Sequence, residues 1–166
     1  MEERTTSQVT RPREEARTSY DRLSRWYDLL AGRSERRCME IGLRALDARE
    51  GEAVLEIGPG TGRALVTLAQ AAGGAGRVCG LDLSAGMLRA AQARLGRAGV
   101  REQVRLVRGD ARTLPFTANC FDVLFMSFAL ELFDAPEIPA VLRECRRVLR
   151  PGGRIGLVAL KQEERP

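Results

Sequence analysis

The sequence predicts an α/β domain with a mostly parallel sheet and helices on both faces. Two observations carry this prediction. Five short apolar runs alternate with segments of helical periodicity, and such alternation builds a parallel sheet with right-handed crossovers. The run Phe121–Ser127 is almost continuously apolar, which is typical of a strand buried on both faces.

Length and composition indicate one folded domain. The chain has 166 residues, of which 44% are hydrophobic, and this suits a single domain with a real core. Residues 1–18 are polar and charged, so we expect a disordered tail there and a folded domain over 19–166. No apolar run approaches the roughly 20 residues of a membrane span, and the N-terminus has no signal-peptide pattern. The expected compartment is the cytoplasm.

The charge pattern does not favour a nucleic-acid partner. The net charge is +5 and the isoelectric point about 9.6, but a single lysine, Lys161, accompanies arginines that are spread through every segment. Many arginines alternate with acidic residues, which indicates an arginine-biased composition rather than a basic patch. The chain has no histidine, and its four cysteines form no C-x-x-C pair. We therefore expect no metal site.

The expected elements follow from apolar periodicity and from glycine and proline breaks. Two helices precede the first strand and form an N-terminal helical arm. Ser84 is a good N-cap for the helix that follows the second strand. In chain order, we expect helices 19–30 and 33–48, strand 53–57, helix 61–72, strand 77–81, helix 85–97, strands 104–108 and 121–127, a helix from near 136 through 149, a break at 151–153 and strand 154–160.

The first strand runs into a glycine-rich turn, residues 58–62, which precedes a helical pattern. Glycine tolerates positive φ and lets the backbone approach a ligand, and the helix start offers free N–H groups. A dinucleotide site would have the spacing G-x-G-x-x-G. Here the third glycine comes one residue early and Arg63 takes its place. This spacing disfavours a dinucleotide-dependent oxidoreductase.

Polar side chains follow the next strands of the expected sheet. Asp82 comes about 20 residues after the glycine turn, the spacing of a carboxylate that accepts ribose hydroxyls; the alternative is a helix cap, a role that Ser84 already suits. Asp110 could accept from an adenine amine or be an ordinary loop acid. Glu56 could favour the cationic end of a ligand or hold the turn. Ser127 ends the fourth strand. We expect these residues to converge on one crevice at the carboxyl ends of the strands.

Five stretches occur together in a familiar order and spacing: Glu56–Gly62, Gly80–Ser84 with Met87 and Leu88, Gly109–Ala111 with Leu114–Phe116, Phe121–Asp122, and Arg147–Gly153. They resemble the motifs of class I S-adenosylmethionine (SAM)-dependent methyltransferases. The most similar branch contains the C-methyltransferases of ubiquinone and menaquinone biosynthesis, whose N-terminal Tyr-Asp signature is similar to residues 20–28. The resemblance covers about residues 19–160.

The resemblance implies a Rossmann-like sheet of five strands in the order 3-2-1-4-5, and SAM as cofactor. It implies that the glycines and Thr61 line the methionine part, that Asp82 holds the ribose and that Leu83 and Met87 flank the adenine. Asp110 and Ala111 would read the adenine edge. Ser127 would lie under the sulfonium, and two tyrosines would close the site unless they only pack a helix. The implied cofactor contacts are Tyr20, Tyr27, Glu56, Gly58, Gly60, Thr61, Gly62, Asp82, Leu83, Met87, Asp110, Ala111 and Ser127.

The resemblance also implies an activity: in-line methyl transfer to a small-molecule acceptor, with neither a metal nor a covalent intermediate. The acceptor is not identified by the sequence. No general base is evident, and Glu131 and Asp134 are the nearest candidates by position. The family sheet normally has two further strands after the fifth. Without them the fifth strand would be an exposed edge that could pair with a second copy. The alternative function is therefore a SAM-binding module that is inactive without its last strands or a partner.

Overall fold

The structure is a computed structural model, and it describes residues 32–159. The expected helix over 19–30, with Tyr20 and Tyr27, lies outside the described residues, as does the C-terminal segment 160–166. The described elements are α3 (Arg33–Leu46), β1 (Ala53–Ile57), α4 (Arg63–Ala72), β2 (Arg77–Asp82), α5 (Ala85–Arg97), η1 (Arg101–Gln103), β3 (Val104–Arg108), β4 (Phe121–Ser127), η2 (Leu130–Leu132), α6 (Ile138–Val148) and β5 (Leu149–Val158).

The sheet has five strands in the order β3-β2-β1-β4-β5, and every neighbouring pair is parallel. This confirms the α/β class and the strand order that the resemblance implied. β1 is the central strand, and its Leu55 pairs in register with Cys79 of β2 and Leu124 of β4. All five residues of β1 are buried. The central strand thus delivers the glycine turn to the middle of one sheet edge.

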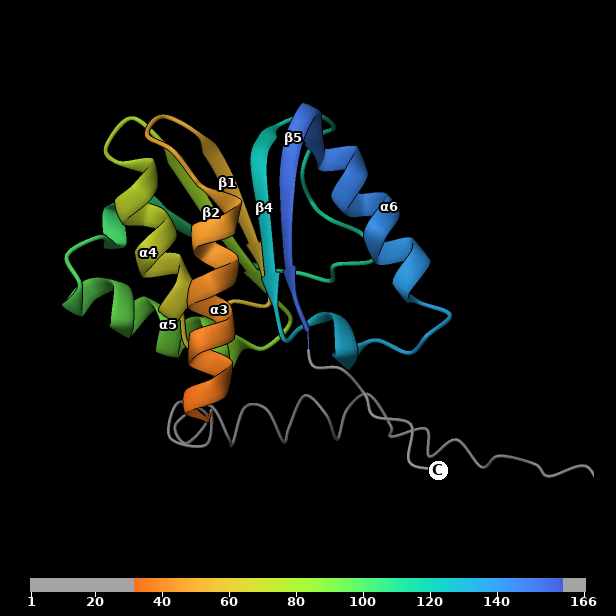
Figure 1. The fold of residues 1–166 in the computed structure, drawn as a ribbon, viewed down its shortest axis with the longest axis horizontal. Coiled ribbons are helices and arrows are strands. Elements are labelled where there is room, and N and C mark those ends of the chain that lie inside the picture. The colour runs from red at the N-terminus through yellow and green to blue at the C-terminus, as the bar shows by residue number, and fades with distance from the viewer. Residues whose placement is uncertain (1–31, 160–166) are drawn as a thin grey trace, which may run out of the picture.

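Helices cover both faces of the sheet (Figure 1). On one face, α3, α4 and α5 contribute apolar side chains to a core that includes Phe125. On the other face, α6 contributes Val141, Cys145 and Val148 to a second core that includes Leu124. Successive residues of a strand point to opposite faces, so neighbouring residues of β4 serve the two cores.

Close packing fixes α3 against the outer strand. A Cβ added to Gly42 would lie 2.4 Å from Cγ2 of Val158, so this helix position needs glycine. Leu43 and Leu46 of the same helix are buried. α3 ends at Leu46 with Asp47 as its C-cap in the left-handed conformation, φ 51°. The predicted end at residue 48 was therefore two residues late.

The prediction for the α6–β5 junction was wrong. α6 ends at Val148, and Leu149 is extended, with φ −74° and ψ 138°. Leu149 already pairs with Phe121, whereas Val123 pairs with Arg154. The break expected at residues 151–153 is therefore an irregularity inside β5, which starts five residues before the predicted Arg154 and ends at Val158 rather than 160. At its other end α6 begins at Ile138, two residues after the predicted start.

The cysteines divide by burial. Cys145 is 1% exposed, and burial raises the pKa of its thiol to about 11. Cys79 of β2 is half-buried. Among residues 32–159, no group of three or more histidine, cysteine or acidic side chains could hold a metal ion. None of the helices within the same residues has the length and hydropathy of a membrane span.

Candidate functional site

The glycine turn after β1 contains three left-handed glycines that serve different purposes. Gly58, Gly60 and Gly62 have φ of 69°, 53° and 82°. A Cβ on Gly58 would lie 2.6 Å from Cβ of Ala129, and one on Gly62 would lie 2.9 Å from Cβ of Ala91. At Gly60 nothing lies within 4 Å of the added atom. Two glycines thus permit close packing, and Gly60 leaves open backbone where a ligand can approach.

Gly62 also explains why α4 starts later than predicted. It is the N-cap of α4, and its φ of 82° and ψ of 22° are not helical for an L-residue. Thr61, where the helix was predicted to begin, therefore belongs to the turn and is buried at 7% exposure. The backbone N–H of Gly58 donates to the carbonyl oxygen of Leu81 at 2.9 Å. This bond joins the turn to the end of β2.

Asp82 at the end of β2 lies against the same turn. Its Oδ2 accepts from the N–H of Gly60 at 3.3 Å, and its Oδ1 accepts from the N–H of Ser84 at 2.9 Å. Ser84 caps α5 as predicted, because its Oγ accepts from the N–H of Met87 at 3.2 Å. Asp82 therefore connects the glycine turn with the start of α5. A carboxylate accepts hydrogen bonds at about four sites, which is the chemistry that ligand hydroxyls require.

Glu56 is buried directly behind the turn. Its side chain is 1% exposed, and its Oε2 has no hydrogen-bond partner within residues 32–159. Burial, and secondarily the negative charge of Asp82, raise the pKa of this carboxyl to about 8. Glu56 therefore binds a proton at neutral pH in this arrangement. A cation placed nearby would favour the ionised form.

Asp110 has a partner that the sequence analysis missed. The guanidinium of Arg112 forms an ion pair with Asp110, with Nε 2.9 Å from Oδ1, and the N–H of Arg112 donates to Oδ1 at 2.9 Å. Nη1 of Arg112 also lies 2.6 Å from Oε1 of Glu137 at the start of α6. These two carboxylates raise the pKa of Arg112 well above its usual range, the bond to Asp110 being the larger cause. Asp110 is thus a fixed acid rather than an isolated loop residue.

Helix α6 also fixes the loop that follows Asp110. Oε2 of Glu144 accepts from the N–H of Leu114 at 2.7 Å, and Arg147 donates to the carbonyl oxygens of Leu114 and Phe116 at 3.0 and 2.7 Å. Arg147 and Glu144 form an ion pair with each other. Ala111 at the start of this loop is 4% exposed. The loop beyond β3 is therefore fixed by bonds to a helix distant in sequence.

The remaining predicted site residues differ in exposure. Leu83 is 47% exposed, whereas Met87 is 3% exposed and packs as a core residue. Ser127 at the end of β4 is half-buried. The next residue, Phe128, is left-handed with φ 53°, an unusual conformation for an aromatic residue that no sequence signal indicated. Its N–H donates to the carbonyl oxygen of Val158 at 2.8 Å.

The candidate bases suggested by position are solvent-exposed. Glu131 and Asp134 lie in and after η2, and both are exposed. The N–H of Asp134 donates to Oε2 of Glu137 at 3.2 Å. The structure brings Glu56, Gly60 and Asp82 together at the ends of β1 and β2, and Asp110 lies two residues beyond the end of the adjacent strand β3. The tyrosines of the predicted site lie outside the described residues.

These features define a class of protein. A parallel sheet in the order 3-2-1-4-5, with an open glycine turn after its central strand and an acid after each of the next two strands, is a Rossmann-like nucleotide-binding domain. A family model described as methyltransferase domain matches residues 54–153. The chain belongs to this methyltransferase-domain family.

Relatives of the chain have consistent names. A demethylmenaquinone methyltransferase of Bacillus subtilis is 30% identical over 146 residues, which cover 88% of this chain and 60% of the relative. A demethylmenaquinone methyltransferase of Corynebacterium kroppenstedtii is 37% identical over 149 residues, which cover 87% of this chain and 59% of the relative. The crystal structure of a SAM-dependent methyltransferase from Aquifex aeolicus superposes with a TM-score of 0.67 at 28% identity, covering 76% of this chain and 66% of that one. The chain thus spans about three fifths of the length of these two curated relatives.

The cofactor that this family implies is SAM, and the residues present fit it. Gly60 offers backbone with no described atom in the way. Asp82 is a carboxylate acceptor of the kind that ribose hydroxyls bind. Glu56 has a buried oxygen without a partner in the described part of the chain, which suits a ligand with a positively charged end.

Proposed function

We propose that the protein containing this chain transfers a methyl group from SAM to a small-molecule acceptor, and that the acceptor is of the quinone type. The observation that carries the proposal is the bond from Gly60 to Asp82 beside the buried carboxyl of Glu56. Relatives named demethylmenaquinone methyltransferases support the acceptor class. The expected compartment is the cytoplasm.

SAM supplies a methyl group that is already activated by a positively charged sulfur. The chain's own contribution is to bind and orient. Asp82 accepts from the ribose hydroxyls, the Gly60 backbone lies against the methionine part, and Glu56 favours its cationic end. Alignment of this kind contributes up to about 7–11 kcal/mol to lowering a barrier. No described residue is assigned as a general base, and the exposure of Glu131 and Asp134 makes them poor candidates for holding a proton away from water.

A second candidate function is a SAM-binding module that does not catalyse methyl transfer by itself. The observation that favours it is the outer strand β5, where Ile155 and Leu157 are 42% and 45% exposed. A partner chain that covered this strand could complete the acceptor side of the site. The two functions share the cofactor and differ in whether this chain alone transfers the methyl group.

Calorimetric titration with SAM, S-adenosylhomocysteine and NAD tests the cofactor. We expect saturable binding of the first two, none of NAD, and loss of most binding in Asp82→Ala. A folded chain that binds neither sulfur compound would contradict the proposal. Transfer of label from methyl-labelled SAM to demethylmenaquinone then tests the activity. Cofactor binding without label transfer to this or any other quinone acceptor would favour the inactive module.

A further inference from the structure

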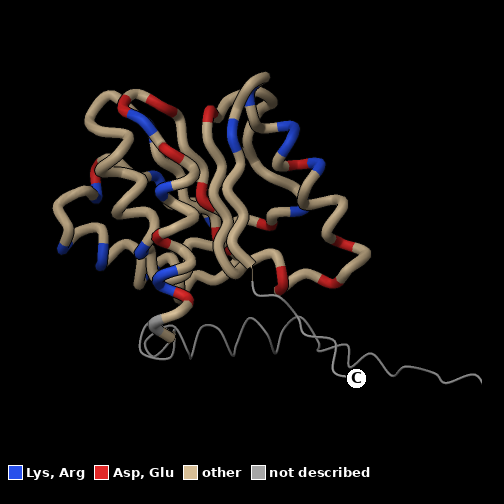
Figure 2. The backbone as a smooth tube through the Cα atoms, viewed as in Figure 1, with Lys and Arg blue, Asp and Glu red and all other residues tan. Residues whose placement is uncertain are grey.

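The start of α6 carries an acid that the cofactor interpretation does not use. Glu137 is the N-cap residue of α6, although serine, threonine, aspartate and asparagine are the preferred residues at this position. Figure 2 shows acidic positions along the connection between β4 and α6, and charges of both signs on α6 itself. The side chain of Glu137 is 21% exposed, so most of it lies against the protein. Its role therefore follows from what it contacts rather than from the helix end.

The two carboxylate oxygens of Glu137 bind different parts of the protein. Oε1 lies 2.6 Å from Nη1 of Arg112, in the loop after β3. Oε2 accepts from the N–H of Asp134 at 3.2 Å, in the connection after β4. The backbone N–H of Glu137 also donates to the carbonyl oxygen of Asp134 at 2.8 Å. One residue thus joins the segments that follow β3 and β4, two strands that β2 and β1 separate in the sheet.

Arg112 extends this contact to a predicted cofactor residue. Its guanidinium forms an ion pair with Asp110, and its backbone N–H donates to Oδ1 of the same acid at 2.9 Å. The N–H of Thr113 donates to the carbonyl oxygen of Asp110 at 3.1 Å, so these residues form a tight turn. A planar guanidinium that binds one carboxylate on each of two sides has a defined orientation. The position of Glu137 therefore sets the direction from which Arg112 holds Asp110.

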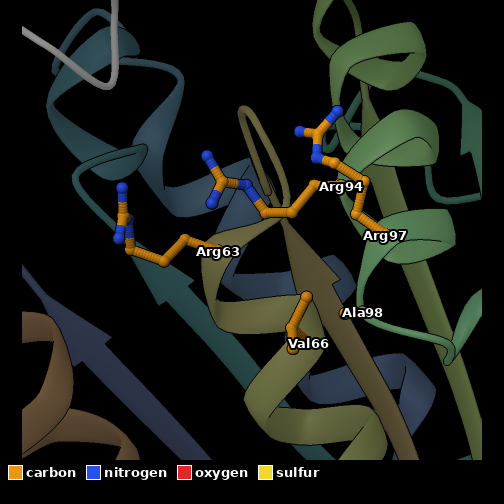
Figure 3. Close-up of a pocket in the computed structure, with 5 residues that line it drawn as sticks. All are labelled: Arg63, Val66, Arg94, Arg97 and Ala98. Atoms are coloured by element: carbon orange, nitrogen blue, oxygen red, sulfur yellow. The ribbon is translucent and has the colours of Figure 1, made fainter.

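An arginine also holds the other side of the candidate site. Nε of Arg94, on α5, donates to the carbonyl oxygen of Thr61 in the glycine turn at 3.0 Å. Figure 3 shows this side chain between those of Arg63 and Arg97. That bond fixes the turn directly to a helix. Asp110 is held by an arginine only two residues away, and such a local pair moves with its own loop. The contact with Glu137, 25 residues from Arg112, fixes the pair to the rest of the domain.

From these contacts we propose that Glu137 is a positioning residue of the cofactor site, which acts through Arg112 to hold Asp110 where it reads the adenine of SAM. The inference rests on the proposed function, because it takes Asp110 as an adenine contact. Hydrogen bonds weaken steeply when donor and acceptor are misaligned. Without Glu137, the pair of Arg112 and Asp110 shifts as a unit and the bond to adenine loses its alignment. The fold changes little, because solvent screens an ion pair whose side chains are 29% and 21% exposed.

The test is calorimetric titration of the chain and its variants with SAM. Glu137→Ala should weaken SAM about three- to tenfold, the range that one ordinary hydrogen bond supplies. Glu137→Gln keeps an oxygen acceptor for Arg112 and should weaken SAM less. Asp134→Asn is the matched control, because it removes the same charge three residues away and keeps the backbone N–H that Glu137 binds, and it should bind SAM like the parent. The double variant Glu137→Ala/Arg112→Gln should bind no more weakly than Arg112→Gln alone, because Glu137 acts through Arg112.

Amide hydrogen exchange of the chain without SAM gives a readout that does not depend on the cofactor. The amides of Arg112 and Thr113 donate to Asp110 and should exchange faster in Glu137→Ala than in the parent. The amides of Gly60 and Ser84 donate to Asp82 instead and should exchange at the parental rate. Equal rates at all four amides in parent and variant would contradict the role of Glu137 as an anchor.

The inference and the proposed function fail in different ways. A folded parent that binds no SAM would overturn the proposed function and this inference with it. A parent that binds SAM, together with a Glu137→Ala variant of parental affinity, would overturn the inference alone. Additive losses in the double variant would also overturn it, since they would indicate that Glu137 acts on the start of α6 rather than through Arg112. Far-ultraviolet circular dichroism shows that each variant is folded.

Discussion

The carboxylate of Asp82 accepts a hydrogen bond from the backbone of Gly60, with 3.3 Å between Oδ2 and the amide nitrogen. The two residues are 22 positions apart in the chain and end up adjacent because β1 and β2 are parallel neighbours. The same carboxylate holds the N–H of Ser84. One side chain thus joins the glycine turn to the start of α5 and is also the proposed partner of the ribose, so the two roles have to be separated experimentally.

Asp82→Asn should separate them. The amide keeps one oxygen acceptor, so it can hold only one of the two backbone N–H groups, and it loses the charge that strengthens bonds to ribose hydroxyls. Hydrogen bonds to a charged group contribute about 1.5–3 kcal/mol, so we expect SAM to bind roughly 10- to 150-fold more weakly in calorimetry. The free energy of unfolding should fall by about the 0.5–1.5 kcal/mol of one backbone hydrogen bond. Asp134→Asn, an exposed acid after η2, serves as the control, and an equal loss of affinity there would contradict the assignment.

Glu56 should make the domain less stable as pH rises. Its folded pKa is raised to about 8, whereas an unfolded glutamate titrates near 4.3. Between these values the folded state binds the extra proton, so the free energy of unfolding falls with pH by up to about 1.4 kcal/mol per unit. Below the lower pKa both states are protonated, and above the higher pKa both are ionised, so the slope from this group disappears.

Glu56→Gln tests this dependence, because glutamine is close in shape and does not titrate. Urea unfolding of both proteins between pH 5 and pH 8 should give the variant a growing relative advantage as pH rises. Parallel curves for the two proteins would contradict the raised pKa. If a cation of SAM lies near Glu56, the parent should also release protons when SAM binds at pH 7, and the variant should release fewer.

Alanine at Gly60 and at Gly62 should have different effects. An added Cβ at Gly62 would lie 2.9 Å from Cβ and 3.0 Å from Cα of Ala91, so the variant should lose about 1–3 kcal/mol of stability through overpacking in addition to backbone strain. At Gly60 the added atom meets nothing within 4 Å, leaving only the strain of a positive φ, about 1–2 kcal/mol. Gly60→Ala should nevertheless lose SAM binding. Thermal unfolding and titration of both variants provide the comparison, and a Gly60→Ala variant with parental affinity would contradict the assigned approach of the ligand.

The sequence predicted the interior of the fold better than its junctions. β1, β3, β4 and α5 have the predicted bounds, because buried apolar runs and the Ser84 cap are local signals. The strand that begins at Leu149 was missed, since residues 149–150 continue a helical pattern and are recruited by pairing with Phe121. That pairing joins positions far apart in the chain, and no window of sequence contains it.

The same difference between local signals and long-range contacts decided which site residues the sequence predicted. The acids after β2 and β3 were visible because they end apolar runs. The role of Arg112 was not visible in the sequence. Arg112 also binds Glu137, which is 25 residues away and lies beside it because α6 packs there.

Arg112→Gln should weaken SAM binding more than it destabilises the fold. The side chains of Arg112 and Asp110 are 29% and 27% exposed, so solvent screens the pair and its loss should cost at most about 1 kcal/mol of stability. SAM affinity should fall several-fold, because Asp110 would no longer be held. Arg49→Gln breaks the exposed pair with Asp47, whose side chains are 67% and 61% exposed, and should change neither quantity. Unchanged affinity in Arg112→Gln would separate Asp110 from the cofactor.

The outer strand β5 should mediate pairing of two copies. Gly156 and Val158 face α3, where an added Cβ on Gly156 would lie 3.2 Å from Leu46. Ile155 and Leu157 alternate with them on the other face and remain 42% and 45% exposed, beside an edge whose backbone groups can pair with another strand. We expect light scattering after size exclusion to give a mass that rises with concentration toward a dimer, and lysines at Ile155 and Leu157 to keep the chain monomeric. Ile41→Lys on α3, where the parent isoleucine is 51% exposed, controls for added charge and should still associate. A parent that is monomeric at every concentration, or an Ile41→Lys variant that is equally impaired, would exclude this edge as the interface.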